Sequence, residues 1–191
     1  MGRSLKRCAW ATHEPLISYH DTEWGTPLHD ERKLFEFLIL EGAQAGLSWE
    51  TILRKRDAYR RAFDRFDPKK VARYTSRDVA RLLKDAGIVR NRAKITSAIG
   101  NAKVFLEIQK EHGSFDRYLS GLTEAAVLSR DLKARGMRFV GPTIAESFME
   151  ATGRLDHHEP GCFRTGMRRR RSRPPPSRSR STRGRSAALL A

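Results

Sequence analysis

The sequence has only two cysteines in 191 residues, and no stretch of it approaches the roughly 20 consecutive apolar residues that a transmembrane helix needs. Residues 1–10 also lack the apolar middle region of a secretory signal. Two cysteines are too few for the disulfide framework of a small secreted domain. We therefore expect a cytoplasmic protein with no membrane partner.

Strand signals are scarce as well, since no segment alternates apolar and polar residues for long. Apolar residues instead recur three or four positions apart, as they do between Trp49 and Phe66, which is typical of helices that face a core. Expected helix starts are Asp67-Pro68, Ser76, Ser129 and Gly141-Pro142, and expected ends are Gly87, Gly113, Gly136 and Gly153. The pattern predicts an all-α domain of about seven or eight helices, including a helix, hairpin, helix arrangement around Gly87.

Positive charge is concentrated at one end of the chain. The formal net charge is +16, and the ten arginines after Cys162, where no acidic residue occurs, leave +6 for residues 1–162. We predict a folded domain over residues 1–165 and a disordered Arg/Ser/Pro-rich tail over residues 166–191. The tail is interpreted either as a basic arm for nucleic acid or as a solvated or out-of-frame segment.

Each cysteine has a histidine at chelating distance: Cys8 with His20, and His158 with Cys162. Together the two pairs have the composition of a Cys2His2 zinc site, which has no open coordination position and serves to hold the structure together. His157 is a rival ligand because it neighbours His158. The alternative is two incidental buried thiols and surface histidines.

One acidic residue stands out because its neighbours are apolar. Glu41 lies among leucine, isoleucine and alanine residues, where a carboxylate is desolvated unless it meets a cation or hydrogen-bond donors. The alternative is a glutamate on an exposed helix face. Trp24 and Trp49, taken alone, are interpreted as core residues.

Several longer motifs are distributed along the chain. They are Arg7-Cys8-Ala9-Trp10, Tyr19-His20-Asp21, Glu23-Trp24-Gly25, Glu41-Gly42 through Ser48-Trp49, Asp85-Ala86-Gly87-Ile88, Gly100-Asn101-Ala102, Phe139-Val140-Gly141 and Ser147-Phe148-Met149. In these motifs the chain closely resembles the bacterial 3-methyladenine DNA glycosylase I family over about residues 6 to 164.

The resemblance implies a helix-hairpin-helix superfamily fold with one structural zinc per chain, held by Cys8, His20, His158 and Cys162. It also implies a monomer that acts on alkylated double-stranded DNA by flipping out 3-methyladenine and hydrolysing its N-glycosidic bond, the first step of base excision repair. Carried over by position, Glu41 and Tyr19 match the reaction centre, and Trp49 and Trp10 match the residues that bind the base.

The hairpin is expected to contact DNA phosphates through Gly87, Arg90, Arg92 and Lys94, although these charges also suit a solvated helix start. Two segments, 8–20 and 120–128, look shorter than the family pattern. A non-catalytic module that binds damaged DNA is the competing hypothesis. The retained pocket residues favour the enzyme, and no lysine stands out as a Schiff-base nucleophile.

Overall fold

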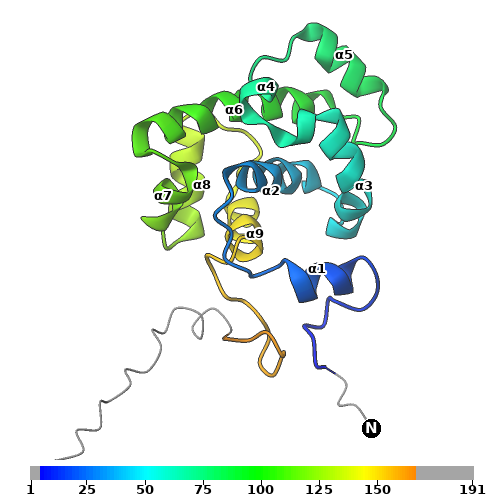
Figure 1. Cartoon of the computed structure of the whole chain (residues 1–191), viewed down its shortest axis with the longest axis vertical. Coiled ribbons are helices and arrows are strands. Elements are labelled where there is room, and N and C mark those ends of the chain that lie inside the picture. Colours follow the sequence, from blue (N-terminus) through cyan, green and yellow to red (C-terminus); the bar gives the residue numbers. More distant parts are fainter. Residues whose placement is uncertain (1–4, 167–191) are drawn as a thin grey trace, which may run out of the picture.

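The computed structural model describes residues 5–166, and its ordered elements are all helical (Figure 1). They are α1 (Leu16–Thr22), α2 (Glu31–Gln44), α3 (Trp49–Ala62), the 3-10 turn η1 (Asp64–Phe66), α4 (Pro68–Val71), α5 (Ser76–Lys84), α6 (Arg92–His112), α7 (Phe115–Ser120), α8 (Ala125–Ala134) and α9 (Pro142–Ala151). No strand occurs within this range, which confirms the all-α prediction. The short helices α1 and α7 were not predicted, because their few residues carry no clear period.

Helix α2 is the centre of the domain. It contacts α3, α6, α7 and α9, and ten consecutive residues from Leu34 to Ala43 are buried. A helix segment that is covered on every side must bury whatever polar residues it carries, and the buried stretch of α2 carries two, Glu36 and Glu41. In Figure 1, α9 lies beside α2, so a residue far along the sequence can approach this central helix.

The predicted helix boundaries hold where a local signal decides them. Asp67 caps α4 by accepting hydrogen bonds from the backbone N–H groups of Lys69 and Lys70, and Pro68 is the first helical residue, as expected. The expected cap at Ser76 was wrong, because Thr75 caps α5 in a capping box with Asp78. The expected cap at Ser129 was also wrong. That residue lies inside α8, where its buried hydroxyl donates to the carbonyl of Val140.

Gly87 does not end a helix in the left-handed conformation, so that prediction was wrong as well. Helix α5 ends at Lys84, and Gly87 is absent from the glycines with positive φ. A Cβ at Gly87 would instead lie 2.7 Å from the Cβ of Ala58. Glycine is needed here because the connection between α5 and α6 passes against α3. Gly113, in contrast, ends α6 with φ +85°, as expected.

A buried charge network ties α1, α2 and α3 together. Arg56 of α3 is only 7% exposed; its Nε lies 2.5 Å from Glu36 Oε1 and its Nη1 lies 2.7 Å from Glu23 Oε2. Its guanidinium carbon also lies 5.0 Å from the centre of the Phe37 ring. Because a buried charge is costly unless it is paired, these contacts fix the three helices relative to one another.

Within residues 5–166, no helix is long and apolar enough to cross a membrane. The predicted tail, residues 166–191, lies outside the described residues except for Gly166.

Candidate functional site

A cavity of about 330 Å³ opens between α1, α2, α3 and α9. Its lining combines aromatic rings with carboxylates: Trp10, Leu16, Tyr19, Trp24, Glu41, Gln44, Ser48, Trp49, Glu50, Ser147 and Glu150. This set includes all four residues that the family resemblance assigned to the reaction centre and to base binding: Glu41, Tyr19, Trp49 and Trp10. The fold therefore brings together side chains that are 39 positions apart, from Trp10 to Trp49.

Glu41 is the most unusual group in the cavity wall. It is 2% exposed, and its Oε2 has no hydrogen-bond partner among the described residues. Burial raises the pKa of this carboxyl to about 8, and the charge of Glu150 adds to the rise. At neutral pH the carboxyl in the free protein is therefore mostly protonated. A cation that entered the cavity would favour its ionised form.

Aromatic rings surround this carboxyl. The Tyr19 and Trp49 ring centres are 5.4 Å apart, and Trp10 lies 6.2 Å from Tyr19. The Phe37 ring stacks on the Trp49 ring with their centres 6.5 Å apart, and the guanidinium group of Arg56 lies over the Phe37 ring. The Nε1 of Trp49 is buried without a partner in the described part of the chain, so the cavity offers one free donor beside the free acceptor of Glu41.

Sequence reasoning missed the contribution of α9. Ser147 and Glu150 lie three residues apart on this helix, on the side that lines the cavity. Ser147 lies in a motif that carried the resemblance, but nothing in the local sequence marks either residue as functional. Trp24, interpreted from sequence as core, is buried and also lines the cavity.

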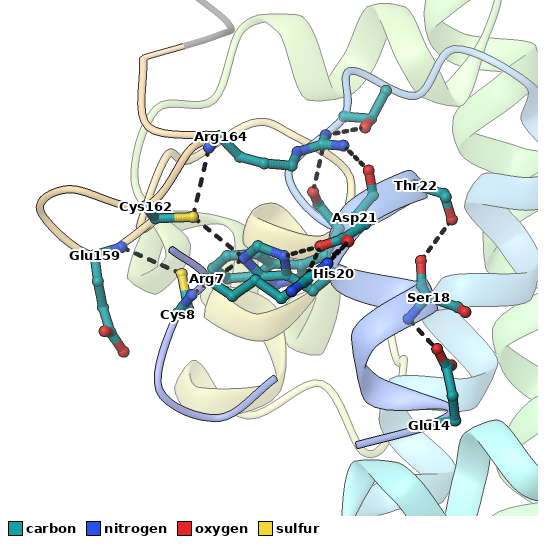
Figure 2. Close-up of polar contacts among 12 residues, drawn as sticks. Arg7, Cys8, Glu14, Ser18, His20, Asp21, Thr22, Glu159, Cys162 and Arg164 are labelled. Carbon is teal, nitrogen blue, oxygen red and sulfur yellow. Dashed lines mark hydrogen bonds and ion pairs between the residues drawn. The ribbon is translucent and has the colours of Figure 1, made fainter. Parts of the chain in front are cut away.

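A second cluster joins the two ends of the described chain. One ligand atom from each of Cys8, His20 and Cys162 lies within 4.8 Å of the others, and all three residues are buried. Figure 2 shows the two thiols beside the His20 ring, with the Cys162 sulfur 3.4 Å from His20 Nε2. Burial raises the pKa of the Cys8 thiol to about 11. Buried thiols and an imidazole are a donor set that zinc prefers, and zinc binding would release the thiol protons.

His158 adjoins this cluster, whereas His157 does not. The His158 ring centre lies 5.5 Å from that of His20, and its buried Nε2 has no partner in residues 5–166. Gly25 leaves room for the ring, since a Cβ there would lie 2.4 Å from His158 Cε1. His157 is exposed, and its Nδ1 is hydrogen bonded to Glu150. The orphaned Nε2 makes His158 the better fit for a fourth ligand.

Both buried histidines are oriented by carboxylates. His20 Nδ1 lies 2.8 Å from Asp21 Oδ1, and Arg7 in turn holds Asp21 (Figure 2). His158 Nδ1 lies 2.9 Å from Asp156 Oδ1. A carboxylate on Nδ1 fixes the tautomer that leaves Nε2 free to bind a metal, which is the usual outer shell of a histidine-ligated zinc.

The predicted phosphate contacts around the hairpin differ in their surroundings. Lys94 is partly buried, and its Nζ donates to the carbonyls of Ala43 and Ala45 at 2.8 and 2.6 Å. The N–H of Gly87 donates to Asp85 Oδ1. Arg90 and Arg92 are exposed and have no side-chain partner in the described range. Lys94 therefore joins α6 to the end of α2, and the two arginines carry the free charge.

Comparison with known proteins assigns the family. The model of the methyladenine glycosylase family matches residues 10–127 and 120–165, which together span most of the chain. The chain belongs to the methyladenine glycosylase family. The two matched pieces meet near residues 120–127, one of the segments that looked shorter than the family pattern.

Curated relatives agree with this family assignment. The chain is 45% identical over 179 residues to DNA-3-methyladenine glycosylase 1 of Escherichia coli, a match that covers 83% of this chain and 96% of the relative. It is 39% identical over 177 residues to DNA-3-methyladenine glycosylase of Haemophilus influenzae, with 82% and 96% covered.

Solved structures of the family match the fold. A crystal structure of 3-methyladenine DNA glycosylase I superposes with a TM-score of 0.80 at 41% identity, covering 84% of this chain and all of that one. A structure of the Staphylococcus aureus enzyme, titled as the structural basis of 3-methyladenine recognition, matches with a TM-score of 0.78 at 38% identity, covering 83% and 95%.

Proposed function

We propose that this member of the methyladenine glycosylase family is a DNA-3-methyladenine glycosylase, a hydrolase that removes 3-methyladenine from alkylated double-stranded DNA. The observation that carries the proposal is the buried, unpartnered carboxyl of Glu41 inside a cavity walled by Trp49, Tyr19 and Trp10. Such a cavity suits a flat cation with an N–H group at its edge. 3-Methyladenine in DNA is a cation of this kind, and the relatives' names point to the same substrate.

The reaction begins with binding of the flipped base. The ring faces of Trp49 and Tyr19 attract the positive charge, an effect worth roughly 0.5–2 kcal/mol for each ring. Glu41 releases its proton to solvent water and accepts a charge-assisted hydrogen bond from the exocyclic N–H. Normal adenine is neutral, so both its attraction to the aromatic rings and its hydrogen bond to Glu41 are weaker. Discrimination therefore rests on the charge of the lesion.

Bond cleavage needs little acid catalysis. The positive charge already weakens the N-glycosidic bond, because the base leaves as a neutral molecule. Glu41 and Tyr19 hold the base while a water molecule attacks the sugar. The cavity residues thus act by binding and orientation.

DNA contacts come from two segments. In the proposed assignment to the helix-hairpin-helix superfamily, α5, residues 85–91 and α6 form the hairpin, and Arg90 and Arg92 contact phosphates. The loop between α2 and α3 carries Leu47, which is 41% exposed although it is a large apolar residue. Because the loop joins two cavity-lining residues, Gln44 and Ser48, Leu47 is placed to fill the space that the flipped base vacates.

Cys8, His20, His158 and Cys162 would hold one zinc ion per chain. With four protein ligands, the ion would supply a structural cross-link and would have no position for a reacting water. The cross-link joins the segment before α2 to the segment after α9. It supports the cavity, since Trp10 and Tyr19 lie next to ligands in the sequence. The protein acts as a monomer in the cytoplasm.

The alternative, a binding module without activity, makes a different prediction for methylated DNA. We expect the wild-type protein to release 3-methyladenine, and much less 7-methylguanine, from methylated duplex DNA in a base-release assay that resolves the two. Binding of methylated duplex without any base release would favour the module.

The role of Glu41 is tested by Glu41→Gln, with Glu50→Gln as the matched control. Glu50 also lines the cavity, but Arg54 and His13 already pair with it at 2.7 and 3.2 Å. At pH 9, where Glu41 is ionised, replacing its charge-assisted hydrogen bond by a neutral one should cost roughly 1.5–3 kcal/mol, about ten- to a hundredfold in affinity for free 3-methyladenine. Cleavage should fall less. Equal affinities of wild type and Glu41→Gln, measured by calorimetry, would remove Glu41 from the base site.

A further inference from the structure

Three carboxylates line the cavity, and no lysine, arginine or histidine does: the acids are Glu41, Glu50 and Glu150. Glu50 is neutralised by Arg54, and it also lies 3.2 Å from His13 Nε2. Glu150 has no arginine or lysine partner among residues 5–166, and its carboxylate contacts His157 Nδ1. The cavity therefore contains two acidic groups without a permanent cation, and only one of them was expected from the sequence.

Glu150 acts on Glu41 through space. The two side chains come from different helices, α9 and α2, which pack against each other. The charge of Glu150 is the second cause, after burial, of the raised pKa of Glu41. A field that reaches the Glu41 carboxyl must also reach a base bound against that carboxyl, because both occupy the same cavity.

From this arrangement we infer that Glu150 is a second specificity-determining carboxylate, which favours a cationic methylated purine over a neutral one. The inference rests on the proposed function. His157 positions the group by holding one carboxylate oxygen at the rim of the cavity. Glu150 and Glu41 form a coupled pair, in which the arrival of a cationic base replaces the proton on Glu41.

The coupling gives the pair a signature that a structural role would not produce. At pH 7, removing the charge of Glu150 has two opposed effects. The base loses an attraction, while Glu41 becomes easier to ionise. At pH 9, which is above the pKa of Glu41 of about 8, Glu41 is already ionised. The only remaining effect is then the loss of the attraction between Glu150 and the base. The other ionisable groups around the pair are Tyr19, Glu50, Glu146 and His157.

The experiment compares Glu150→Gln with Glu146→Gln, which alters a neighbouring exposed carboxylate on the same helix that does not line the cavity. For each protein, kcat/KM is measured for release of 3-methyladenine from duplex DNA at pH 7 and pH 9. The Kd is measured for a duplex that carries the neutral isostere in which N3 of the methylated base is replaced by carbon. Zinc content and melting temperature are checked for every variant.

We expect Glu150→Gln to lower kcat/KM about three- to tenfold at pH 9 and about twofold or less at pH 7. Its Kd for the neutral isostere should stay within about twofold of wild type, and Glu146→Gln should match wild type throughout. An unchanged kcat/KM at pH 9 overturns the inference, as does an equal loss on the cationic lesion and the neutral isostere. A wild-type protein without base release would instead refute the proposed function.

Glu150→Ala provides a second variant in case the amide introduces a contact of its own. It also removes the charge and should reproduce the loss at pH 9. His157→Gln tests the positioning role: it keeps the charge on Glu150 but loosens its hold, so it should raise KM with little change in kcat. If His157→Gln behaves like the wild type, His157 has no positioning role. The role of Glu150 is then decided by the Glu150 variants alone.

Discussion

At the scale of single residues, the buried carboxyl of Glu41 links function to stability. Its pKa is raised from 4.5 to about 8 in the folded protein, mainly by burial. Between these two pH values the folded protein retains a proton that the unfolded chain has released. The free energy of unfolding contributed by this group therefore falls as pH rises through this window.

Glu41→Gln removes this titration, so we expect the variant to gain stability over wild type as pH rises from 5 to 8. The gain should be on the order of 1–3 kcal/mol, which corresponds to about 2–4 °C in melting temperature for each kcal/mol in a domain of this size. Calorimetry of both proteins across this range checks it. A difference in melting temperature that stays constant with pH would contradict the raised pKa.

Glu36 on the same helix has the cationic partners that Glu41 lacks. Both carboxylates lie in the fully buried stretch of α2, but Glu36 contacts Arg56 and Arg60 at 2.5 and 2.9 Å. Helix α3 supplies Glu36 with two arginine partners, whereas Glu41 Oε2 has no hydrogen-bond partner among the described residues. A glutamate kept without a partner in such a place is costly unless a ligand supplies one.

At the scale of elements, the network of Arg56 holds α3 against α2. Arg56→Met should destabilise the protein by roughly 2–4 kcal/mol, because Glu23 and Glu36 lose a buried partner. Arg60→Met is the matched control: Arg60 shares Glu36 but its side chain is 39% exposed, so the cost should be about 1 kcal/mol or less. Urea unfolding of both variants measures the difference. Equal costs would show that the network does not behave as a buried one.

The loop between α2 and α3 is expected to act on duplex DNA and not on the free base. Leu47→Ala should lower kcat/KM for base release from duplex DNA about tenfold or more, since nothing then fills the gap left by the flipped base. Affinity for free 3-methyladenine should be unchanged, because Leu47 does not line the cavity. Loss of free-base affinity would mean that the loop shapes the cavity itself.

At the scale of the whole molecule, the cluster of cysteine and histidine side chains joins the two ends of the described chain. Cys8 and His20 precede α2, whereas His158 and Cys162 follow α9, so a bound zinc would join segments more than 130 residues apart. Arg164 strengthens the same junction by donating to the carbonyl of Asp21 (Figure 2). It also donates to Thr26 Oγ1 at 2.6 Å. The junction supports the side of the cavity that carries Trp10 and Tyr19.

We expect one zinc per chain in the native protein. Cys162→Ala and His158→Gln should both lower zinc content, measured by elemental analysis, and should lower the melting temperature by several degrees. His157→Gln should retain its zinc. If the purified native protein contains no zinc, the metal site is refuted. If His157→Gln loses its zinc and His158→Gln does not, the fourth ligand is His157 and not His158.

Local signals in the sequence determined the helical class and several boundaries. Asp67-Pro68 and Gly141-Pro142 start helices because capping and the fixed φ of proline act within one turn. Similar short-range reasoning failed at Ser76 and Ser129. At Ser76 the neighbouring Thr75 forms the cap, and at Ser129 the hydroxyl is used by Val140, which belongs to a different segment.

The tertiary structure alone decided the rest of the site. Residue type and spacing pointed to Glu41 and to the two pairs of candidate metal ligands, whereas the roles of Tyr19, Trp49 and Trp10 came only from the resemblance to the family. The sequence could not place Glu150 in the cavity or show that Lys94 binds the carbonyls at the end of α2, and the spacing of residues by itself left His157 open as a rival to His158. Each of these depends on which distant helix packs alongside, and a contact between residues that are 50 to 140 positions apart leaves no periodic trace in the chain.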